Sequence, residues 1–556
     1  MGTRTDDNYA MTFLRRLATF LFAILIAAGL IAGDRMSDAY WLALLGAAWL
    51  LLLVALWPAL PADLPTFART TVRTGILLTT IFIILGIQLL RIQVVQSEAI
   101  ANRVGTDPAT GEVIANPRLQ VADLAIRRGR IFDANGAILA DTVFDGNTAR
   151  RVYPDPSVAH VVGYFSPLLY GKAGLEATYD HVLAGQDGAN AIEREINALL
   201  GRPAAGLDLR LTLDGTLQRL AHERLAGRAG AVVLIEVETG AVLALASQPG
   251  YDPNALFTAS VTERDAAVAA WEILVADPAA PLVPRASQGL YTPGSTFKVI
   301  TAAAVIDAGY AIPDTVYDDD GMLNVDGRLI EERNRPDPSR DRWTLREGVE
   351  WSLNVVFAQI GLQLGPTLLW DYAGAFGFEQ PVPFDLPVAV SHVASSPAFL
   401  ESLPAVADTG FGQGELQATP LLMAMTAAGI ANQGAIMRPY LVAEITAPEG
   451  EVVSRTGPAV WRQAVAPGVA GQVAAMMVST VEQGLAGAAA IPGVTVGGKT
   501  GTAELGDGQE PHAWFIGFAG DPSPRYAVSV VLEHGGAGMA GTMEIGRDLL
   551  AAALAP

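Results

Sequence analysis

The sequence has no cysteine among its 556 residues. This absence excludes disulfide scaffolds, thiol nucleophiles and cysteine-ligated zinc or iron–sulfur sites. Histidine is scarce as well, and its six copies never stand three or four residues apart, so a helical zinc motif is not expected. The sequence implies neither a metal site nor an organic cofactor.

Positive charge is also in short supply. The chain has 57 acidic and 36 basic residues, for a formal net charge of −21. Nucleic acid is therefore not expected as a partner, because phosphate binding needs clustered lysine and arginine. Lysine occurs only three times, at Lys172, Lys298 and Lys499. Since a lysine amine can be tuned into a base and an arginine cannot, these three positions are the first to inspect.

Apolar residues, in contrast, form three long runs near the start of the chain, at positions 17–33, 40–60 and 75–90. A helix that crosses the roughly 30 Å hydrocarbon layer needs about 20 mainly apolar residues. The second run meets this length easily, and the other two are at its short end. We therefore predict a membrane region over residues 1–95 with about three transmembrane helices; one true span plus an apolar hairpin is the alternative.

The charges around these runs predict their orientation. Several arginines precede the first run or separate the second from the third (Arg4, Arg15, Arg16, Arg69 and Arg73). The loop between the first two runs carries only Arg35, beside Asp34 and Asp38. The positive-inside rule then places the N-terminus in the cytoplasm and, with three spans, the chain after residue 90 outside.

Residues 96–209 are predicted to form a mixed unit of short strands and turns, with strands at 121–126 and 137–140. The Asn135-Gly136 pair between apolar runs is a strong hairpin signal. The arginines at 127, 128 and 130 are typical of an anion site or of an ion-paired structural patch, and we favour the patch.

From residue 211 the segments become longer and predict an α+β domain. The expected helices are at 295–308, 344–364 (interrupted) and 420–432, and the expected strands are at 231–237, 241–247, 494–502, 513–519 and 527–533. Strands at both ends with helices between them favour an antiparallel sheet whose first and last strands meet, covered by helices. Residues 318–320 and 337–341 are expected to be exposed acidic loops.

The first candidate site is Tyr291-Thr-Pro-Gly-Ser295-Thr-Phe-Lys298. The Pro-Gly pair predicts Ser295 in the first turn of a helix, where unpaired N–H groups favour developing negative charge. Lys298 can reach the serine hydroxyl from the same helix face. Serine needs an adjacent base, and neutral Lys298 is the available one. A lone S-x-x-K is more often a capping serine beside an exposed lysine.

A second motif, Trp351-Ser352-Leu353-Asn354, precedes an apolar helix and supplies a hydroxyl and an amide on one short turn. Taken alone, it reads as a helix cap.

The third motif, Gly497-Gly-Lys499-Thr500-Gly501-Thr502-Ala-Glu504, is predicted to lie on a strand. Its glycines would let a ligand backbone approach the strand edge, and its lysine and threonines suit a carboxylate. An ordinary strand with bulges is the alternative.

The motifs S-x-x-K, S-x-N and K-T-G, in this order, resemble the signature of penicillin-binding proteins and serine β-lactamases. Two of the three lysines fall inside it. Further segments resemble those of class B penicillin-binding proteins, which are monofunctional peptidoglycan D,D-transpeptidases: residues 128–140, 230–247, 412–432 and 512–519. The resemblance runs from about residue 96 to the end.

This resemblance implies an α+β, membrane-anchored chain. A mixed, non-catalytic pedestal (dimerisation-like) domain at 96–209 would precede a penicillin-binding transpeptidase domain at 210–556, with an antiparallel sheet, helices on both of its sides and an all-helical subdomain. The family usually has a single membrane anchor, so the first two spans depart from its pattern. The middle motif is Ser-Leu-Asn, which favours a penicillin-binding protein over a class A β-lactamase. About 120 residues separate the last span from the transpeptidase region, which leaves no room for a glycosyltransferase domain.

The resemblance also implies a serine acyl-enzyme mechanism, with catalytic and substrate-binding groups at Ser295, Lys298, Ser352 and Asn354, and at Lys499, Thr500, Gly501 and Thr502. The expected substrates are peptidoglycan stem peptides ending in D-Ala-D-Ala, the expected inhibitors are β-lactams, and the expected partner is a membrane glycosyltransferase. Alternatives that keep the site are a D,D-carboxypeptidase, a membrane-tethered β-lactamase, a β-lactam-sensing receptor and a catalytically silent scaffold.

Overall fold

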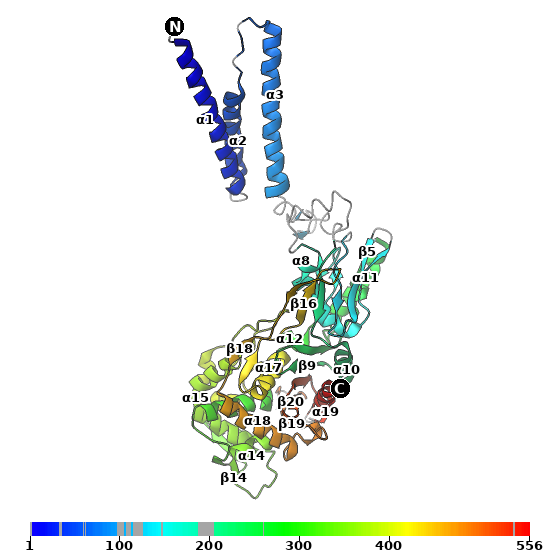
Figure 1. Ribbon diagram of the computed structural model, residues 1–556. Helices are drawn as coiled ribbons and strands as arrows, with labels where there is room; N and C mark the ends of the chain where they lie inside the picture. The colour runs from blue at the N-terminus through cyan, green and yellow to red at the C-terminus, as the bar shows by residue number, and fades with distance from the viewer. Residues whose placement is uncertain are drawn as a thin grey trace. The chain divides into compact units, whose positions relative to one another are not determined.

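The computed structural model describes residues 3–32, 36–58, 60–61, 63–96, 105–106, 113–114, 126–145, 148–186, 205–258, 261–506, 508–536 and 540–555. The chain divides into two compact units, Met1–Val121 and Ala122–Pro556 (Figure 1).

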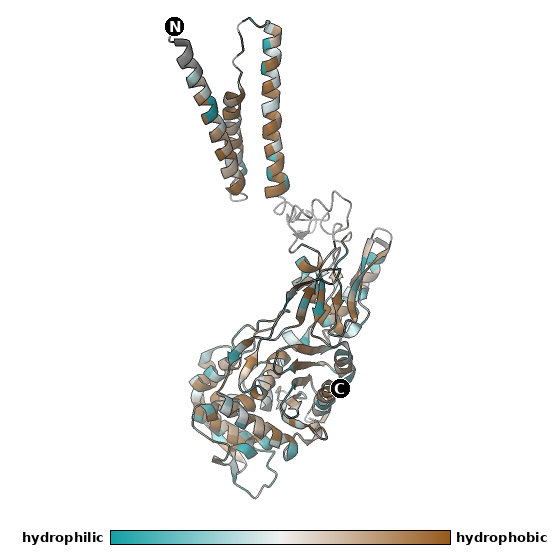
Figure 2. Cartoon of the chain, viewed as in Figure 1, coloured by the Kyte–Doolittle hydropathy of each residue, from teal (hydrophilic) through white to brown (hydrophobic). Residues whose placement is uncertain are grey.

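The first unit is built from three long helices, α1 (Thr3–Ala32), α2 (Asp38–Leu56) and α3 (Thr66–Leu90). Three helical segments are long and apolar enough to cross a membrane: Met11–Ala32 in α1, Asp38–Leu56, and Thr66–Val95, which is α3 with the following π-helical turn η2 (Arg91–Val95). Most of their residues are hydrophobic, drawn in brown in Figure 2. The third helix begins well before the apolar run at 75–90. Its first turns contain threonines and arginines, which also adopt helical structure.

Polar contacts tie α2 to the end of α3. The buried Trp41 donates its indole N–H to Gln88 Oε1 at 2.5 Å. Arg91, just after α3, pairs with Asp38 at 3.2 Å and lies over the Trp41 ring at 4.8 Å. A polar group in an apolar surrounding needs such partners, so these contacts fix α2 against α3.

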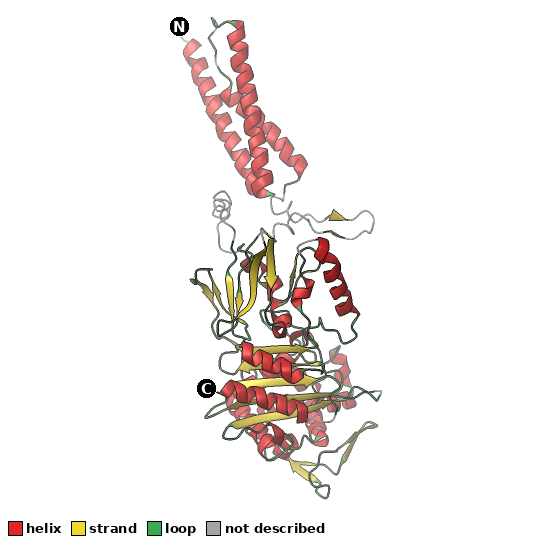
Figure 3. Ribbon diagram, turned by 90° about the vertical axis from the view of Figure 1, so that its right-hand side faces the viewer, coloured by secondary structure: helices red, strands yellow, loops and turns green. Residues whose placement is uncertain are grey.

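The second unit contains a five-stranded antiparallel sheet in the order β10-β9-β21-β20-β19, visible edge to edge in Figure 3. Its strands are β9 (Gly230–Glu236), β10 (Val242–Gln248), β19 (Thr495–Ala503), β20 (His512–Gly520) and β21 (Tyr526–Leu532). The first strand, β9, pairs with the last, β21, so the prediction that the two ends of this region meet is confirmed.

Helices cover both faces of this sheet. On β9 and β21, alternate residues point to opposite sides: Val232 and Val530 pack with α10 (Gly215–Leu225) and α19 (Ala540–Leu554), whereas Val233 and Val531 belong to the core on the other side. That second core contains a group of helices: α13 (Lys298–Asp307), α14 (Leu345–Glu350), α15 (Asn354–Ala375), α16 (Leu403–Gly410), α17 (Pro420–Ala431) and α18 (Pro467–Glu482). The α+β prediction is confirmed.

A six-stranded sheet, β17-β16-β8-β3-β4-β5, is assembled from two distant parts of the sequence. Its strands are β3 (Ile131–Phe132), β4 (Ile138–Asp145), β5 (Thr148–Val152), β8 (Asp208–Leu211), β16 (Val442–Thr446) and β17 (Val452–Arg455). The predicted Asn-Gly hairpin is confirmed: β3 and β4 pair antiparallel, and Gly136 between them has φ +85°. The predicted strand at 121–126 lies outside the described residues except for Ile126, which is in a bend.

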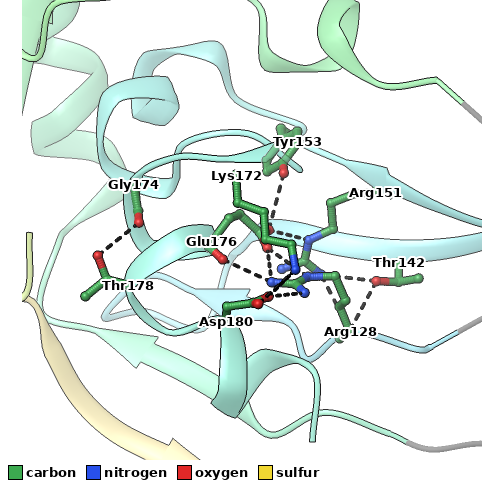
Figure 4. Close-up of polar contacts among 9 residues, drawn as sticks. All are labelled: Arg128, Thr142, Arg151, Tyr153, Lys172, Gly174, Glu176, Thr178 and Asp180. Carbon is green, nitrogen blue, oxygen red and sulfur yellow. Dashed lines mark hydrogen bonds and ion pairs between the residues drawn. The ribbon is translucent and has the colours of Figure 1, made fainter. Parts of the chain in front are cut away.

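Beside this sheet lies a buried ionic cluster (Figure 4). The fully buried Glu176 carboxylate accepts from Arg128 at 3.0 Å and from Arg151 at 2.5 Å. Asp180 pairs with Arg128 at 2.7 Å and with Lys172 at 2.8 Å. The ion-paired interpretation of the arginine cluster is therefore confirmed at Arg128. Lys172, the one lysine outside the three motifs, has a structural partner in Asp180.

One acidic loop differs from its prediction. Residues 337–341 are exposed as expected, but Asp319, in the run at 318–320, is only 1% exposed, so the prediction is wrong there. Pairing of β11 (Val316–Asp318) with β14 (Arg342–Thr344) pulls the chain inward, and the Asp319 N–H donates to Asp341 O at 2.7 Å. Burial raises the pKa of the Asp319 carboxyl.

Candidate active site

Ser295 lies in a short 3₁₀ turn, η5 (Gly294–Phe297), that leads directly into α13. The helix predicted from this serine is present, with its first turn wound more tightly, as is common at helix N-termini. Gly294 has φ +53°, and a Cβ on it would lie 2.5 Å from Thr502 O. Glycine is therefore needed at position 294 for the serine turn to lie this close to the end of β19.

Lys298, one turn after the serine, is completely buried. Its ammonium nitrogen donates to Ser352 O and to Asn354 Oδ1, both at 2.7 Å, and lies 3.3 Å from Ser352 Oγ. The structure thus joins the first and second motifs directly. Burial lowers the pKa of Lys298 to about 7, while the carboxylate of Glu332 acts in the opposite direction.

The second motif forms the sharp turn between α14 and α15. This turn is the interruption that was predicted within the helical region 344–364. Ser352 has φ +58°, a left-handed conformation that is uncommon for serine, and Asn354 is the first residue of α15. Such conformations persist only where surrounding contacts hold them. Here the backbone carbonyl of Ser352 is one of the acceptors that bind Lys298.

The third motif occupies β19, which is the edge strand of the five-stranded sheet. Lys499 is fully buried and donates to Thr500 O at 3.1 Å. Burial, together with the charge of Lys298, holds the pKa of Lys499 well below its ordinary value. Burial is thus the largest cause of the lowered pKa of both lysines.

Close packing explains the glycine of this motif. A Cβ on Gly501 would lie 2.9 Å from Pro293 O and 3.0 Å from Thr296 Cγ2, so the strand reaches the serine turn only without a side chain there. The register places Thr500 opposite Phe515 and Gly501 opposite Trp514. Because successive side chains on a strand point to opposite faces, the two threonines of the motif lie on one face of β19 and the lysine on the other. The buried Thr500 hydroxyl has no hydrogen-bond partner within the described part of the chain.

Two polar residues near the motifs escaped prediction. Gln413 donates its side-chain amide to Thr502 O at 3.3 Å, at the edge of β19. Glu332 accepts from the Val355 N–H at 3.1 Å, beside Asn354. The Gly412-Gln413-Gly414 sequence, with positive φ at both glycines, was a usable signal for the first; no local pattern marks Glu332.

Comparisons with known proteins agree with this arrangement. The family model of the penicillin binding protein transpeptidase domain matches residues 230–551, and that of the penicillin binding protein A dimerisation domain matches residues 128–209. The peptidoglycan D,D-transpeptidase PbpA of Mycolicibacterium smegmatis is 36% identical over 458 residues, covering 79% of this chain and 91% of its own length. MrdA of Escherichia coli K12, also a peptidoglycan D,D-transpeptidase, is 30% identical, with 70% and 69% covered.

A solved structure has the same fold. Penicillin-binding protein A from M. tuberculosis, as its imipenem acyl-enzyme complex, superposes with a TM-score of 0.72 at 36% identity, and the match covers 78% of this chain and all of the other.

Proposed function

The chain belongs to the family of penicillin-binding protein transpeptidases and is a serine-type peptidoglycan D,D-transpeptidase, and we propose that Ser295 is its nucleophile. One observation carries this assignment: Lys298, one turn from Ser295, is buried, is bound by Ser352 and Asn354, and has a pKa of about 7. A buried lysine that is neutral near physiological pH can accept a proton, whereas an exposed lysine cannot.

In the first half of the reaction, Ser295 Oγ attacks the carbonyl carbon of the penultimate D-alanine, and Lys298 takes the hydroxyl proton. The backbone N–H groups of Ser295 and Thr502 hold the resulting oxyanion, which the close approach of η5 to β19 favours. Collapse of this intermediate breaks the peptide C–N bond. Ser352, 3.3 Å from Lys298 Nζ, relays the proton to the departing D-alanine amine.

In the second half, the amine of a neighbouring stem peptide attacks the ester carbon. The proton of this amine returns through Lys298 to Ser295 Oγ as the ester C–O bond breaks. The products are a cross-linked peptide and free enzyme, so no oxidant or cofactor is consumed.

Substrate binding is assigned to the third motif and Asn354. The terminal carboxylate and the backbone of the peptide bind along the β19 edge, at Lys499, Thr500, Gly501 and Thr502. Asn354 orients both the peptide and the Lys298 side chain. The low pKa of Lys499 fits this role, because an incoming carboxylate stabilises the protonated amine and compensates for its burial. Carboxylate binding and proton uptake by Lys499 are therefore coupled.

The membrane arrangement completes the proposal. Residues 1–95 span the membrane three times with the N-terminus in the cytoplasm, residues 96–209 form a pedestal domain, and residues 210–556 form the transpeptidase domain outside. The uneven arginines around the apolar helices support this orientation. A separate membrane glycosyltransferase supplies the glycan strands that this enzyme cross-links.

A cross-linking assay tests the function. The detergent-solubilised full chain is incubated with a pentapeptide-bearing glycan, and released D-alanine and cross-linked dimers are counted. We expect equal amounts of both from the wild type and neither from Ser295→Ala. D-alanine release without dimers would identify a D,D-carboxypeptidase, and dimers from Ser295→Ala would disprove the assignment.

A further inference from the structure

Glu332 lies outside the three motifs but contacts the second of them. It follows β13 (Arg328–Glu331), the second strand of a hairpin with β12 (Met322–Val325). Its Oε2 accepts from the N–H of Val355, in the first turn of α15. The residue at the cap position of that helix, Leu353, provides no side-chain acceptor. The glutamate thus supplies from another segment the acceptor that a helix N-terminus needs.

The Glu332 carboxylate is itself held in place. Its Oε1 accepts from the N–H groups of Arg333 and Asn334 at 2.9 and 3.0 Å. Its own N–H donates to Gly321 O at 2.9 Å. Within the described part of the chain no lysine or arginine forms an ion pair with it; the neighbouring Arg333 pairs with Glu331 instead. The carboxylate is therefore bound only by backbone amides, at the positive end of a helix.

This contact is one residue away from the proposed base. Val355, held by Glu332, follows Asn354, whose Oδ1 accepts from Lys298 Nζ at 2.7 Å. Glu332 is also close enough to act on the charge of Lys298, in opposition to burial. The other charged groups here are Lys499 on β19, Asp319 after β11, and Arg335, which donates to Asp319 O.

We propose that Glu332 is a positioning residue of the active site, which holds the first turn of α15 so that Asn354 and Ser352 present their oxygens to Lys298. This inference rests on the proposed function of Lys298 as the base. Two separable properties of the carboxylate matter: its oxygen fixes the geometry of the turn, and its negative charge favours the protonated form of Lys298.

Two substitutions separate these properties. Glu332→Gln keeps one oxygen that can accept from Val355, loses the second acceptor, which faces Arg333 and Asn334, and removes the charge, whereas Glu332→Ala removes both oxygens and the charge. Glu331→Gln is the matched control, because Glu331 is exposed and pairs on the surface with Arg333. The readout is the second-order rate constant for acylation of the solubilised full chain by labelled penicillin, from pH 5.5 to 9, with thermal unfolding measured in parallel.

We expect Glu332→Ala to acylate about ten- to a hundredfold more slowly at every pH, since a misplaced catalytic group costs that much. Glu332→Gln should keep most of the rate at high pH and shift the acidic limb of the profile to lower pH, because the lost carboxylate no longer favours protonated Lys298. Glu331→Gln should reproduce the wild-type profile.

Other results would overturn the proposal. Wild-type rates and an unmoved limb in both variants would show that Glu332 positions nothing. A glutamine variant as slow as the alanine variant, with an unmoved limb and a lower unfolding temperature, would reduce Glu332 to a structural residue. If Glu332→Ala does not fold, the pH position of the acidic limb of Glu332→Gln decides alone whether the proposal stands. Failure of the proposed function looks different, because the wild type would then show no acylation at Ser295; in that case the proposal falls with it.

Discussion

The fully buried Lys298, at the start of α13, donates to the half-buried Asn354, at the start of α15, over 2.7 Å, so side chains from two helix N-termini meet here. Helix N-termini favour negative charge and disfavour an ammonium group. Both the helix ends and the burial therefore favour the neutral amine of Lys298 over its charged form, compared with the same amine in water.

The acylation rate of the wild type should depend on pH through Lys298. The pKa of Lys298 is lowered to about 7, and only its neutral form accepts a proton. The rate should therefore fall as the pH drops below about 7 and level off above it. A pH series of penicillin acylation measures this, and a rate that stays constant down to pH 5 would contradict the assigned base.

Lys298→Arg should nearly abolish acylation. Arginine retains the positive charge but cannot be deprotonated in a protein, so the site keeps a cation and loses its base. We expect a loss of about 10²–10⁴-fold, the usual contribution of general base catalysis. Thermal unfolding of the same sample checks that the larger side chain is accommodated.

Asn354→Asp should shift the acidic limb of acylation to higher pH. The substitution places a carboxylate where an amide oxygen now accepts from Lys298 at 2.7 Å, and an adjacent negative charge raises the pKa of an amine. The shift is opposite in direction to that expected for Glu332→Gln. Limbs that move the same way in both variants would refute the electrostatic account.

Gly501→Ala should impair acylation without unfolding the protein. Its new Cβ would lie 2.9 Å from the backbone oxygen of Pro293, which forces β19 away from the serine turn. We expect a loss of on the order of 10²-fold, because such displacements misplace reacting groups. Gly457→Ala, where a Cβ meets nothing within 4 Å, is the control.

Glu176→Gln should destabilise the unit that contains the ionic cluster. It leaves Arg128 and Arg151 buried without their shared carboxylate, and breaking a buried pair costs about 3–5 kcal/mol. The pKa of Glu176 is lowered in the fold, so this stability is present above the unfolded pKa and is lost as the pH falls through the folded one. Urea unfolding at pH 7, and over a series of lower pH values that continues below pH 4, measures both effects; Glu263→Gln, in a partly exposed pair with Arg150, is the control.

The sequence predicted those parts of the structure that depend on local patterns. The Asn-Gly hairpin and the interrupted helix around Ser352 were both found. Each was readable because apolar periodicity and turn residues act over a few positions.

Long-range contacts could not be predicted in the same way. Strands β16 and β17 join β8, over two hundred residues earlier in the chain, and no local signal reports that pairing. No local pattern distinguishes Glu332 from the other acidic residues near it in the sequence. Only its contact with Val355 places it at the site. The burial that lowers the Lys298 pKa is likewise a property of the whole fold, and no local pattern shows how complete it is.

The most direct test is to identify the residue that penicillin acylates. The solubilised full chain is labelled at neutral pH, digested, and its adduct-bearing peptide is sequenced by mass spectrometry, with Ser295→Ala treated alongside. We predict one adduct, on Ser295, that persists for many minutes and is missing from the variant. An adduct on another residue, or labelling of Ser295→Ala at the wild-type rate, would contradict the central assignment.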